Sequence, residues 1–403
     1  RQMCIRDSIR SIYHKPPKAM KILMVSMPSL HFFRWVSQLE GAGHEVFWFD
    51  IADGGAPVNR ISWVRQITGW KLKRDYPGRY FVKKYFPRLY SFVQKFNAHD
   101  TAKVFEEKLK EIRPDVVHSF AMYVSCVPIF NVMQKYPNIQ WVYSSWGSDL
   151  FYFKNMPLYK KAMQKVLPHI HFMFSDCLRD RDLAIELGFQ GQFLGVFPGG
   201  GGFDLNLMDS LSVPLPTRNI ILVKGFQGRS GRAIPVIKAL LKLEDKLNGF
   251  KIIVFGADKE VLRFAKKSGF SDWPTVEVFG KISHTETLKL MGKALIYIGN
   301  SNSDGIPNTL LEAICAGAFP IQSNPGGASA EIIKNGENGL LIENCEDVDE
   351  IKAHIQKAFN SRHLLENAYQ INQEKLKPTL GYDALKTEVL KAYHQIGLNL
   401  HKA

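Results

Sequence analysis

The sequence predicts an α/β protein with two doubly wound parallel sheets, each in its own domain, facing each other across a cleft. Short apolar runs that end in polar or glycine-rich turns alternate with amphipathic stretches of helical spacing, a pattern typical of βαβ units. With 403 residues, the chain is long enough for two domains of ordinary size. A segment near the middle, 206–218, carries prolines and interrupts the alternation, as a linker between domains would.

The expected domain organisation follows this alternation. Residues 1–19 precede the apolar run that starts at Met20, and we expect them to be an extension outside any domain. The predicted parts after it are a first domain, the linker, a second domain and a terminal helix, at 20–205, 206–218, 219–379 and 380–403. Each domain is expected to hold its own parallel sheet.

The composition is that of a globular protein with a basic surface. Hydrophobic residues make up 45% of the chain, the formal net charge is +14, and most of the basic excess lies in the first half. No apolar run reaches the length of a membrane span, and no secretory signal is visible. The five cysteines are scattered without metal-ligand spacing: Cys4, Cys126, Cys177, Cys315 and Cys345. We therefore expect a cytoplasmic protein, free or peripheral on the inner face of the membrane.

The first domain opens with a βαβ pattern. Residues 21–27 form an apolar strand, 32–40 have helical spacing, and 46–49 form a second strand. The loop at 28–31 lies at the carboxyl end of the first strand, where doubly wound sheets bind ligands.

Two polar residues follow later strands of the same domain. His118 ends the strand at 115–119, and Asp149 follows the strand at 141–144. Both are expected at the cleft, because the carboxyl ends of parallel strands share one edge of the sheet. We predict that His118 is catalytic and that Asp149 binds an acceptor or organises the site. The alternative for His118 is a structural histidine in the core.

A basic and aromatic segment, 70–96, interrupts the first domain. It contains eight Lys/Arg, nine aromatic residues and one Asp. Cations with interleaved aromatic rings are typical of segments that lie on an anionic membrane surface. The alternative is a helical hairpin packed on the domain with solvated charges. Nucleic acid is not expected as a partner, because no nucleic-acid-binding motif accompanies the segment.

The second domain begins with an apolar strand followed by a basic, glycine-rich loop, 224–232. Such a loop between a strand and a helix suits a diphosphate. We predict Lys224 and Arg229 as its ligands, with Arg232 as a competitor.

The most informative stretch is 298–343, where a strand ends in small polar residues and a helix starts after Pro307. The start of this helix offers free N–H groups and a positive dipole end, which suit a phosphate. Asp304 and Glu312 would place one carboxylate on either side of that phosphate. Because carboxylates suit sugar hydroxyls, the pattern indicates a nucleotide sugar.

These residues resemble the donor-site signature of glycosyltransferase family 4, a family of retaining enzymes with the GT-B fold. The residues that carry the resemblance are Asp304, Gly305, Pro307, Glu312, Ala313, Gly317, Pro320, Gly326, Gly327, Glu331 and 338–341. The family usually has Glu at the first acidic position, where this chain has Asp304. The strand-end segments 114–120 and 146–150 also resemble the family, although Phe120 stands where many relatives carry a second histidine.

The resemblance implies a retaining transfer from a nucleotide-diphosphate sugar to a lipid-linked or saccharide acceptor, in bacterial surface polysaccharide or glycolipid synthesis. The first domain would bind the acceptor and the second the donor, and the terminal helix would cross back to the first domain. Asp304 would orient the sugar, and no metal or other cofactor is expected. The implied donor-binding residues are Lys224, Arg229, Gly305, Ile306, Pro307, Asn308, Thr309, Leu310 and Glu312.

Two alternatives share this fold: a nucleotide-sugar 2-epimerase, which needs extra acid/base groups in the first domain, and a non-catalytic sugar- or nucleic-acid-binding relative. A second acidic motif, Asp180-Arg181-Asp182, spells a pattern that binds metal-nucleotides in another architecture. Here it falls in a predicted amphipathic helix, so we expect a solvated face.

Overall fold

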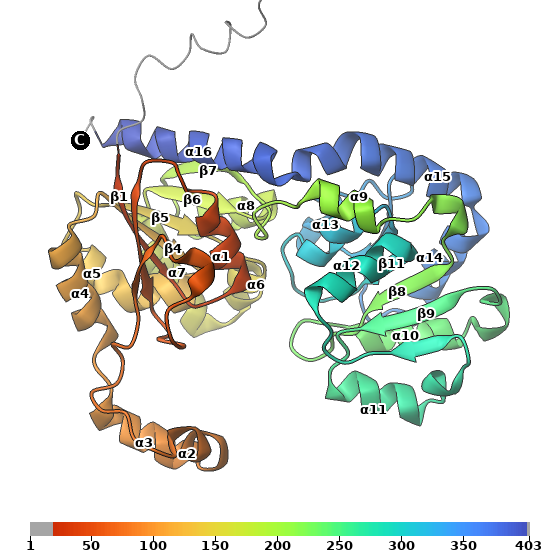
Figure 1. Ribbon diagram of the computed structural model, residues 1–403, viewed down its shortest axis with the longest axis horizontal. Helices are drawn as coiled ribbons and strands as arrows, with labels where there is room; N and C mark the ends of the chain where they lie inside the picture. Colours follow the sequence, from red (N-terminus) through yellow and green to blue (C-terminus); the bar gives the residue numbers. More distant parts are fainter. Residues whose placement is uncertain (1–18, 401–403) are drawn as a thin grey trace, which may run out of the picture.

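The computed structural model describes residues 19–400, apart from the side chain of Tyr80. It contains two α/β domains, each built on a parallel sheet, and a long helix that runs along both (Figure 1). The predicted extension, 1–19, lies outside the described residues except for Ala19.

The first sheet has seven parallel strands in the order β3-β2-β1-β4-β5-β6-β7. Its strands are β1 (Lys21–Ser26), β2 (Glu45–Asp50), β3 (Arg65–Ile67), β4 (Val116–Phe120), β5 (Gln140–Ser144), β6 (Phe172–Ser175) and β7 (Gln192–Val196). The helices of this domain are α1 (Leu30–Ser37), α2 (Arg79–Tyr85), α3 (Pro87–Asn97), α4 (Thr101–Ile112), α5 (Phe130–Met133), α6 (Ser148–Phe151), α7 (Pro157–Val166) and α8 (Leu178–Glu186).

The second sheet has six parallel strands in the order β10-β9-β8-β11-β12-β13. Its strands are β8 (Ile220–Lys224), β9 (Lys251–Phe255), β10 (Val276–Val278), β11 (Ala294–Gly299), β12 (Phe319–Ser323) and β13 (Leu340–Ile342). The remaining helices are α9 (Leu205–Leu211), α10 (Ala233–Leu241), α11 (Lys259–Lys267), α12 (His284–Lys293), α13 (Asn308–Cys315), α14 (Val348–Asn360), α15 (Arg362–Ile371) and α16 (Tyr382–Asn399). The predicted fold class is confirmed.

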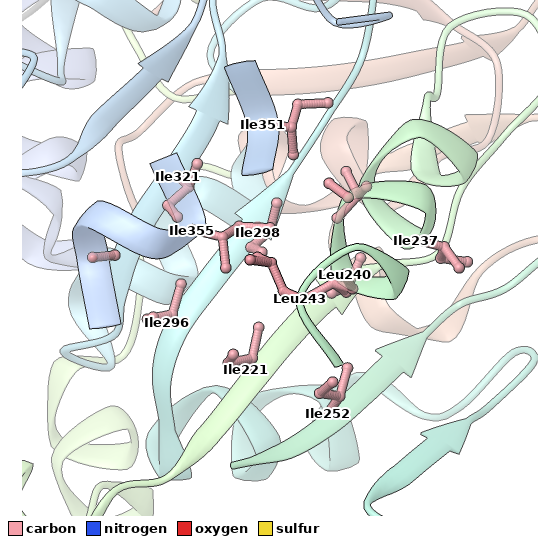
Figure 2. Close-up of a cluster of buried hydrophobic side chains, with 14 of the residues drawn as sticks. Ile221, Ile237, Leu240, Leu243, Ile252, Ile296, Ile298, Ile321, Ile351 and Ile355 are labelled. Carbon is pink, nitrogen blue, oxygen red and sulfur yellow. The ribbon is translucent and has the colours of Figure 1, made fainter. Parts of the chain in front are cut away.

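The central strands are apolar along their whole length because helices cover both faces of each sheet. Figure 2 shows one such layer, in which isoleucines of β8, β9, β11 and β12 meet the inner faces of α10 and α14. The labelled residues are Ile221, Ile237, Leu240, Leu243, Ile252, Ile296, Ile298, Ile321, Ile351 and Ile355. All of these side chains are buried, so the layer anchors the strands whose ends carry the site.

In both sheets the strand order reverses beside the first strand. β1 pairs with β2 and β4, and β8 pairs with β9 and β11. A crevice forms at the carboxyl ends on either side of such a switch point, and ligands of open α/β sheets bind there.

The segments between the domains are ordered. The predicted linker, 206–218, holds most of α9, whose Met208 is buried in the second domain's core. Further on, Leu385, Val389 and Tyr393 of α16 pack among core residues of the first domain. The chain therefore crosses between the domains twice (Figure 1), and each crossing places side chains in a hydrophobic core.

The basic and aromatic segment forms a helical hairpin, α2 and α3, that projects from the first domain (Figure 1). Backbone hydrogen bonds at its base, from Lys73 N to Asn97 O and from His99 N to Lys71 O, tie its two ends together. The alternative prediction of a hairpin is right about its helices, but Phe81, Phe92 and Phe96 on these helices are exposed instead of packed on the domain. Trp70, at the base of the hairpin, does pack on the domain and stacks on Phe49. None of the described helices is long and apolar enough to cross a bilayer.

Candidate active site

The second domain contributes the start of α13 to a cavity of about 380 Å³ between the domains. Pro307 takes the N-cap position, and buried Leu310 and Leu311 anchor the helix in the core. Tyr297, on β11, donates its hydroxyl to Thr309 Oγ1 at 2.9 Å, which fixes the first turn. The predicted residues that line this cavity are Lys224, Asp304, Ile306, Pro307, Asn308 and Thr309.

The first domain lines the same cavity with loops that follow five different strands. Met27 and His31 follow β1, Ala121 follows β4, Trp146 and Gly147 follow β5, and Asp176 follows β6, with Gly199 beyond β7. The predicted ligand loop at 28–31 therefore does reach the cavity. Asp176 was not predicted, and His31 and Trp146 were not singled out within their predicted segments, because these side chains lie on separate loops that only the fold brings together.

His31 contacts the opposite domain directly. Its Nδ1 accepts from the side-chain amide of Asn308 at 2.9 Å, and Asn308 Oδ1 accepts from Gly200 N at 3.0 Å. Burial lowers the pKa of His31, and Arg34 adds to the effect, although a backbone hydrogen bond and two carboxylates oppose it. The neutral imidazole is thus favoured at the edge of the cavity, with Nδ1 as the hydrogen-bond acceptor.

Two carboxyl groups from opposite domains line this cavity: Asp176 of the first domain and Asp304 of the second. Asp176 is buried and accepts from Gly147 N at 2.7 Å, while its Oδ1 has no hydrogen-bond partner. Burial raises the pKa of Asp176 well above its ordinary value, and the charges of Asp180 and Asp304 raise it further. A Cβ on Gly305 would lie 2.3 Å from Asp176 Oδ2, so only glycine allows this approach.

Glu312 lies one helical turn after Asn308 in α13 and is buried. Its Oε1 accepts from His284 Nε2 at 2.7 Å and lies 3.8 Å from Arg34 Nη1 of the first domain. Arg34 and His284 also line a second, larger cavity of about 780 Å³ between the domains. Glu312 therefore contacts two residues of the wall of the larger cavity.

The three cations of the basic loop, 224–232, make different contacts. Lys224 lines the smaller cavity, whereas the guanidinium of Arg229 lies over the ring of Tyr152 in the first domain, 4.5 Å from its centroid. Arg232 forms an ion pair with Glu346 and donates to the carbonyl oxygens of Gly228 and Gly231. Of the three cations considered, Lys224 alone lines the cavity.

His118 does not reach the cavity. Its ring is fully buried, with Nδ1 at 2.6 Å from Tyr393 Oη and Nε2 at 2.8 Å from Ser144 Oγ. It also stacks on Phe120, with centroids 4.1 Å apart. Both ring nitrogens are satisfied inside the protein, so the geometry agrees with the structural alternative and we do not carry His118 forward as catalytic.

Asp149 also lies behind the cavity wall. Both of its oxygens accept from Met122 N, and Tyr143 donates its hydroxyl to Oδ2. Burial raises the pKa of Asp149 to about 7. The carboxyl holds together the loops that follow β4 and β5, so it organises the first-domain wall from inside and makes no contact with the cavity.

The predicted solvated face at Asp180-Arg181-Asp182 is wrong for one of its carboxylates. Asp182 is exposed, but Asp180 is fully buried and accepts from Ser145 Oγ at 2.8 Å and from Arg179. The two carboxylates point to different sides of α8, and Asp180, in the first turn of this helix, is the one that is buried. Among the described residues, Asp176, Cys177 and Asp180 have ligand atoms within 4.8 Å of one another, a spacing that could suit a metal. Arg179 and Ser145 already occupy the carboxylate of Asp180.

Comparison with known proteins agrees with this geometry. Residues 215–375 match the family model described as glycosyl transferases group 1. No curated protein sequence shows significant similarity to the chain.

Solved structures share the fold of the whole chain at low sequence identity. Sucrose-phosphate synthase from Thermosynechococcus elongatus matches with a TM-score of 0.69 and 16% identity, over 94% of this chain and 100% of the other. A glycosyltransferase from Rickettsia africae matches with a TM-score of 0.64 and 14% identity, over 94% and 99%. Anabaena HepE, solved with UDP and glucose, matches with a TM-score of 0.63 and 12% identity, over 93% and 100%. The chain therefore has the GT-B fold of glycosyltransferases, and its second domain matches the group 1 glycosyl transferases over residues 215–375.

Proposed function

We propose that the protein transfers a sugar from a nucleotide-diphosphate sugar to a hydroxyl-bearing acceptor in the smaller cavity. One observation carries the proposal: the start of α13, Lys224 and Asp304 line one cavity opposite polar groups of the first domain. Backbone N–H groups and a cation bind phosphate, while a carboxylate binds hydroxyls. A sugar joined to a diphosphate presents both kinds of group at this spacing.

The diphosphate would lie at the start of α13, against Lys224 and the side chains of Asn308 and Thr309. Glu312 would hold ribose hydroxyls after releasing its hydrogen bond to His284. The larger cavity beside Arg34 leaves room for the nucleoside. The UDP and glucose named for the HepE structure support a donor of this class.

Sugar transfer passes through an oxocarbenium-like state, while charge builds on the departing diphosphate. Lys224 and the α13 N-terminus would stabilise that charge without a metal. Asp304 would orient the sugar. The first-domain carboxyl at the cavity, Asp176, is held toward its neutral form by burial and is therefore a poor nucleophile. We accordingly favour attack from the same face as the leaving group, with retention of configuration.

The acceptor would be a lipid-linked sugar or another saccharide, used in bacterial surface polysaccharide or glycolipid synthesis. The projecting α2–α3 hairpin supports this class of acceptor. Large apolar side chains are exposed along it, including Phe92 at 59% and Phe96 at 67%, beside the cations Lys83, Lys84 and Arg88. Such a surface suits the headgroup region of an anionic membrane, so the protein would work in the cytoplasm, peripheral on the inner face.

A nucleotide-sugar 2-epimerase remains the second candidate because of one observation. That reaction needs acid/base groups in the first domain, and His31 and Asp176 lie at the cavity wall. The two candidates differ in whether an acceptor is required.

One assay separates these candidates. The protein is incubated with UDP-, GDP- and ADP-sugars, with and without an anionic lipid extract, and with and without EDTA. Release of nucleotide diphosphate that needs the extract and survives EDTA supports transfer. Conversion of the sugar without extract identifies the epimerase, and no turnover of any donor rejects both enzymes.

The membrane contact is tested by co-sedimentation with anionic liposomes. Neutralising Lys83, Lys84 and Arg88 to Gln should reduce the bound fraction. The matched control neutralises three exposed cations of α7: Lys160, Lys161 and Lys165. If both triple variants sediment alike, the hairpin is not the membrane contact.

A further inference from the structure

The start of α8 in the first domain is bound to the second domain. The carboxylate of Glu331 accepts the first two N–H groups of the helix, from Leu178 at 2.6 Å and from Arg179 at 2.9 Å. The first N–H groups of a helix have no partner within the helix, and a carboxylate there also complements the helix dipole. A residue of one domain thus caps a helix of the other.

The Arg179 side chain crosses the same boundary in the opposite direction. Its Nη1 donates to the carbonyl oxygens of Asp304, at 2.8 Å, and Pro325, at 2.6 Å, both in the second domain. Its Nη2 and Nε donate to Asp180 Oδ1 at 2.7 and 3.0 Å, within its own domain. One guanidinium therefore joins a buried carboxylate of the first domain to the backbone of Asp304.

The surroundings of Arg179 are closely packed. Its side chain is only 8% exposed, and its guanidinium lies 4.2 Å from the centroid of the Phe151 ring. Gly326 has a φ of +63°, and a Cβ there would lie 2.3 Å from Phe151 and 3.0 Å from Arg179. Water is largely excluded, so the charge-assisted hydrogen bonds are stronger than they would be at a surface.

We propose that Arg179 is a positioning residue for the transfer reaction, and that its contacts together with Glu331 form a latch that holds the two domains closed. The latch ends on the backbone of Asp304, the residue proposed to orient the sugar. Closure and the position of the Asp304 carboxylate are therefore coupled through one side chain. This inference rests on the proposed function for its kinetic part, while the closure of the domains is independent of it.

The test compares Arg179→Met with Arg181→Met, a control on the same helix. Arg181 pairs with its neighbour Asp182 and lies over the ring of Phe193, both within the first domain. Methionine keeps the apolar stem over Phe151 but removes the guanidinium fork. We expect kcat for sugar transfer to fall about 100-fold in Arg179→Met, because a misplaced orienting group costs that much. Binding of UDP, measured by calorimetry, should stay within about twofold, because the phosphate contacts are unchanged.

Solution X-ray scattering with saturating UDP supplies the second readout. Arg179→Met should have a larger radius of gyration than the wild type, and Arg181→Met should not. Equal scattering and equal kcat in the two variants would overturn the latch. A wild type that turns over no donor rejects the proposed function, while the scattering comparison still decides the latch.

Because Asp180 would lose its cationic partner and keep only the hydrogen bond from Ser145, Arg179→Met is accompanied by two milder variants. Arg179→Lys keeps the charge without the fork, and Glu331→Gln leaves one α8 amide without a carboxylate oxygen. Both should show intermediate kcat and scattering. If Arg179→Met does not fold and both milder variants match the wild type, the inference is rejected.

Discussion

The two walls of the cavity are built in different ways. The second-domain wall comes mostly from one continuous stretch, Asp304 to Thr309, joined by Lys224 at the end of β8. The first-domain wall takes side chains from loops after five strands that are far apart in the chain. A continuous wall leaves a motif in the sequence, whereas a wall assembled from separate loops leaves single residues. Accordingly, six of the predicted second-domain residues line the cavity, whereas the two predicted first-domain residues, His118 and Asp149, lie behind its wall.

The same contrast appears in how each wall is held. Backbone groups at a helix start bind phosphate with little dependence on neighbouring side chains. The first-domain wall depends on buried hydrogen bonds made by residues behind it, such as Asp149 and His118. Among the residues predicted from the sequence, substitutions should therefore affect catalysis in the second domain and stability in the first.

The largest effect on activity is expected at the diphosphate. Lys224→Ala should lower kcat for transfer by about 10²- to 10³-fold, because a preorganised cation at the developing charge is lost. Steady-state kinetics measures the loss, and Lys242→Ala, at an exposed ion pair with Asp349, is the control. A wild-type rate in Lys224→Ala would contradict the proposed position of the diphosphate beside Lys224.

The next effect is expected at the sugar. Asp304→Asn should lower kcat/KM about tenfold or more, because hydrogen bonds from sugar hydroxyls to a carboxylate are weakened. Binding of the nucleotide diphosphate alone, which carries no sugar, should not change. Calorimetry with both ligands separates these contributions, and an equal loss for both would contradict a sugar-specific role.

A smaller effect is expected at the nucleoside. Glu312→Ala should weaken binding of the nucleotide diphosphate about tenfold, because the charged hydrogen bonds to ribose are lost. Glu337→Ala, at an exposed ion pair with Lys334, is the matched control. Normal binding by Glu312→Ala would reject the assignment of Glu312 to the donor.

The smallest effect on activity, with a clear effect on stability, is expected at His118. His118→Gln should lower the free energy of unfolding by about 1–3 kcal/mol, because buried hydrogen bonds to Ser144 and Tyr393 are broken, while kcat at saturating substrate stays close to the wild type. Denaturant unfolding measures this, with exposed His363→Gln as the control. A large loss of kcat without a loss of stability would instead support the original prediction that His118 is catalytic.

Stability should also depend on pH through His118. Burial lowers the pKa of the folded ring well below its ordinary value of 6.5, so the unfolded chain binds a proton that the folded protein does not. The contribution of His118 is complete above pH 6.5 and is lost as the pH falls below it. Asp149, whose pKa is raised to about 7, makes the free energy of unfolding change with pH in the opposite direction, because the folded protein binds the extra proton there. Subtracting the free energy of unfolding of His118→Gln from that of the wild type at each pH isolates the contribution of His118.

Much of the fold was predictable because helix and strand periodicities are local. The alternation of apolar runs with amphipathic stretches predicts two parallel sheets, and buried strands such as β8 and β11 bear this out. The burial of Asp180 was not predictable, since its neighbour Asp182 two positions on is exposed. Asp176 was missed because nothing near it in the sequence marks a site, and for His31 the sequence indicated only its loop, 28–31.

The sequence by itself determined the class of fold and the turn and helix start of the second domain that we propose bind phosphate. Both depend on neighbours along the chain: hydrophobic period, glycine, proline and helix start. Only the tertiary structure decided which first-domain side chains reach the cavity and which lie behind it. It also decided that Arg179 and Glu331 join the two domains. Those outcomes depend on how separate loops pack across a boundary, where burial and hydrogen-bond partners come from residues more than a hundred positions away.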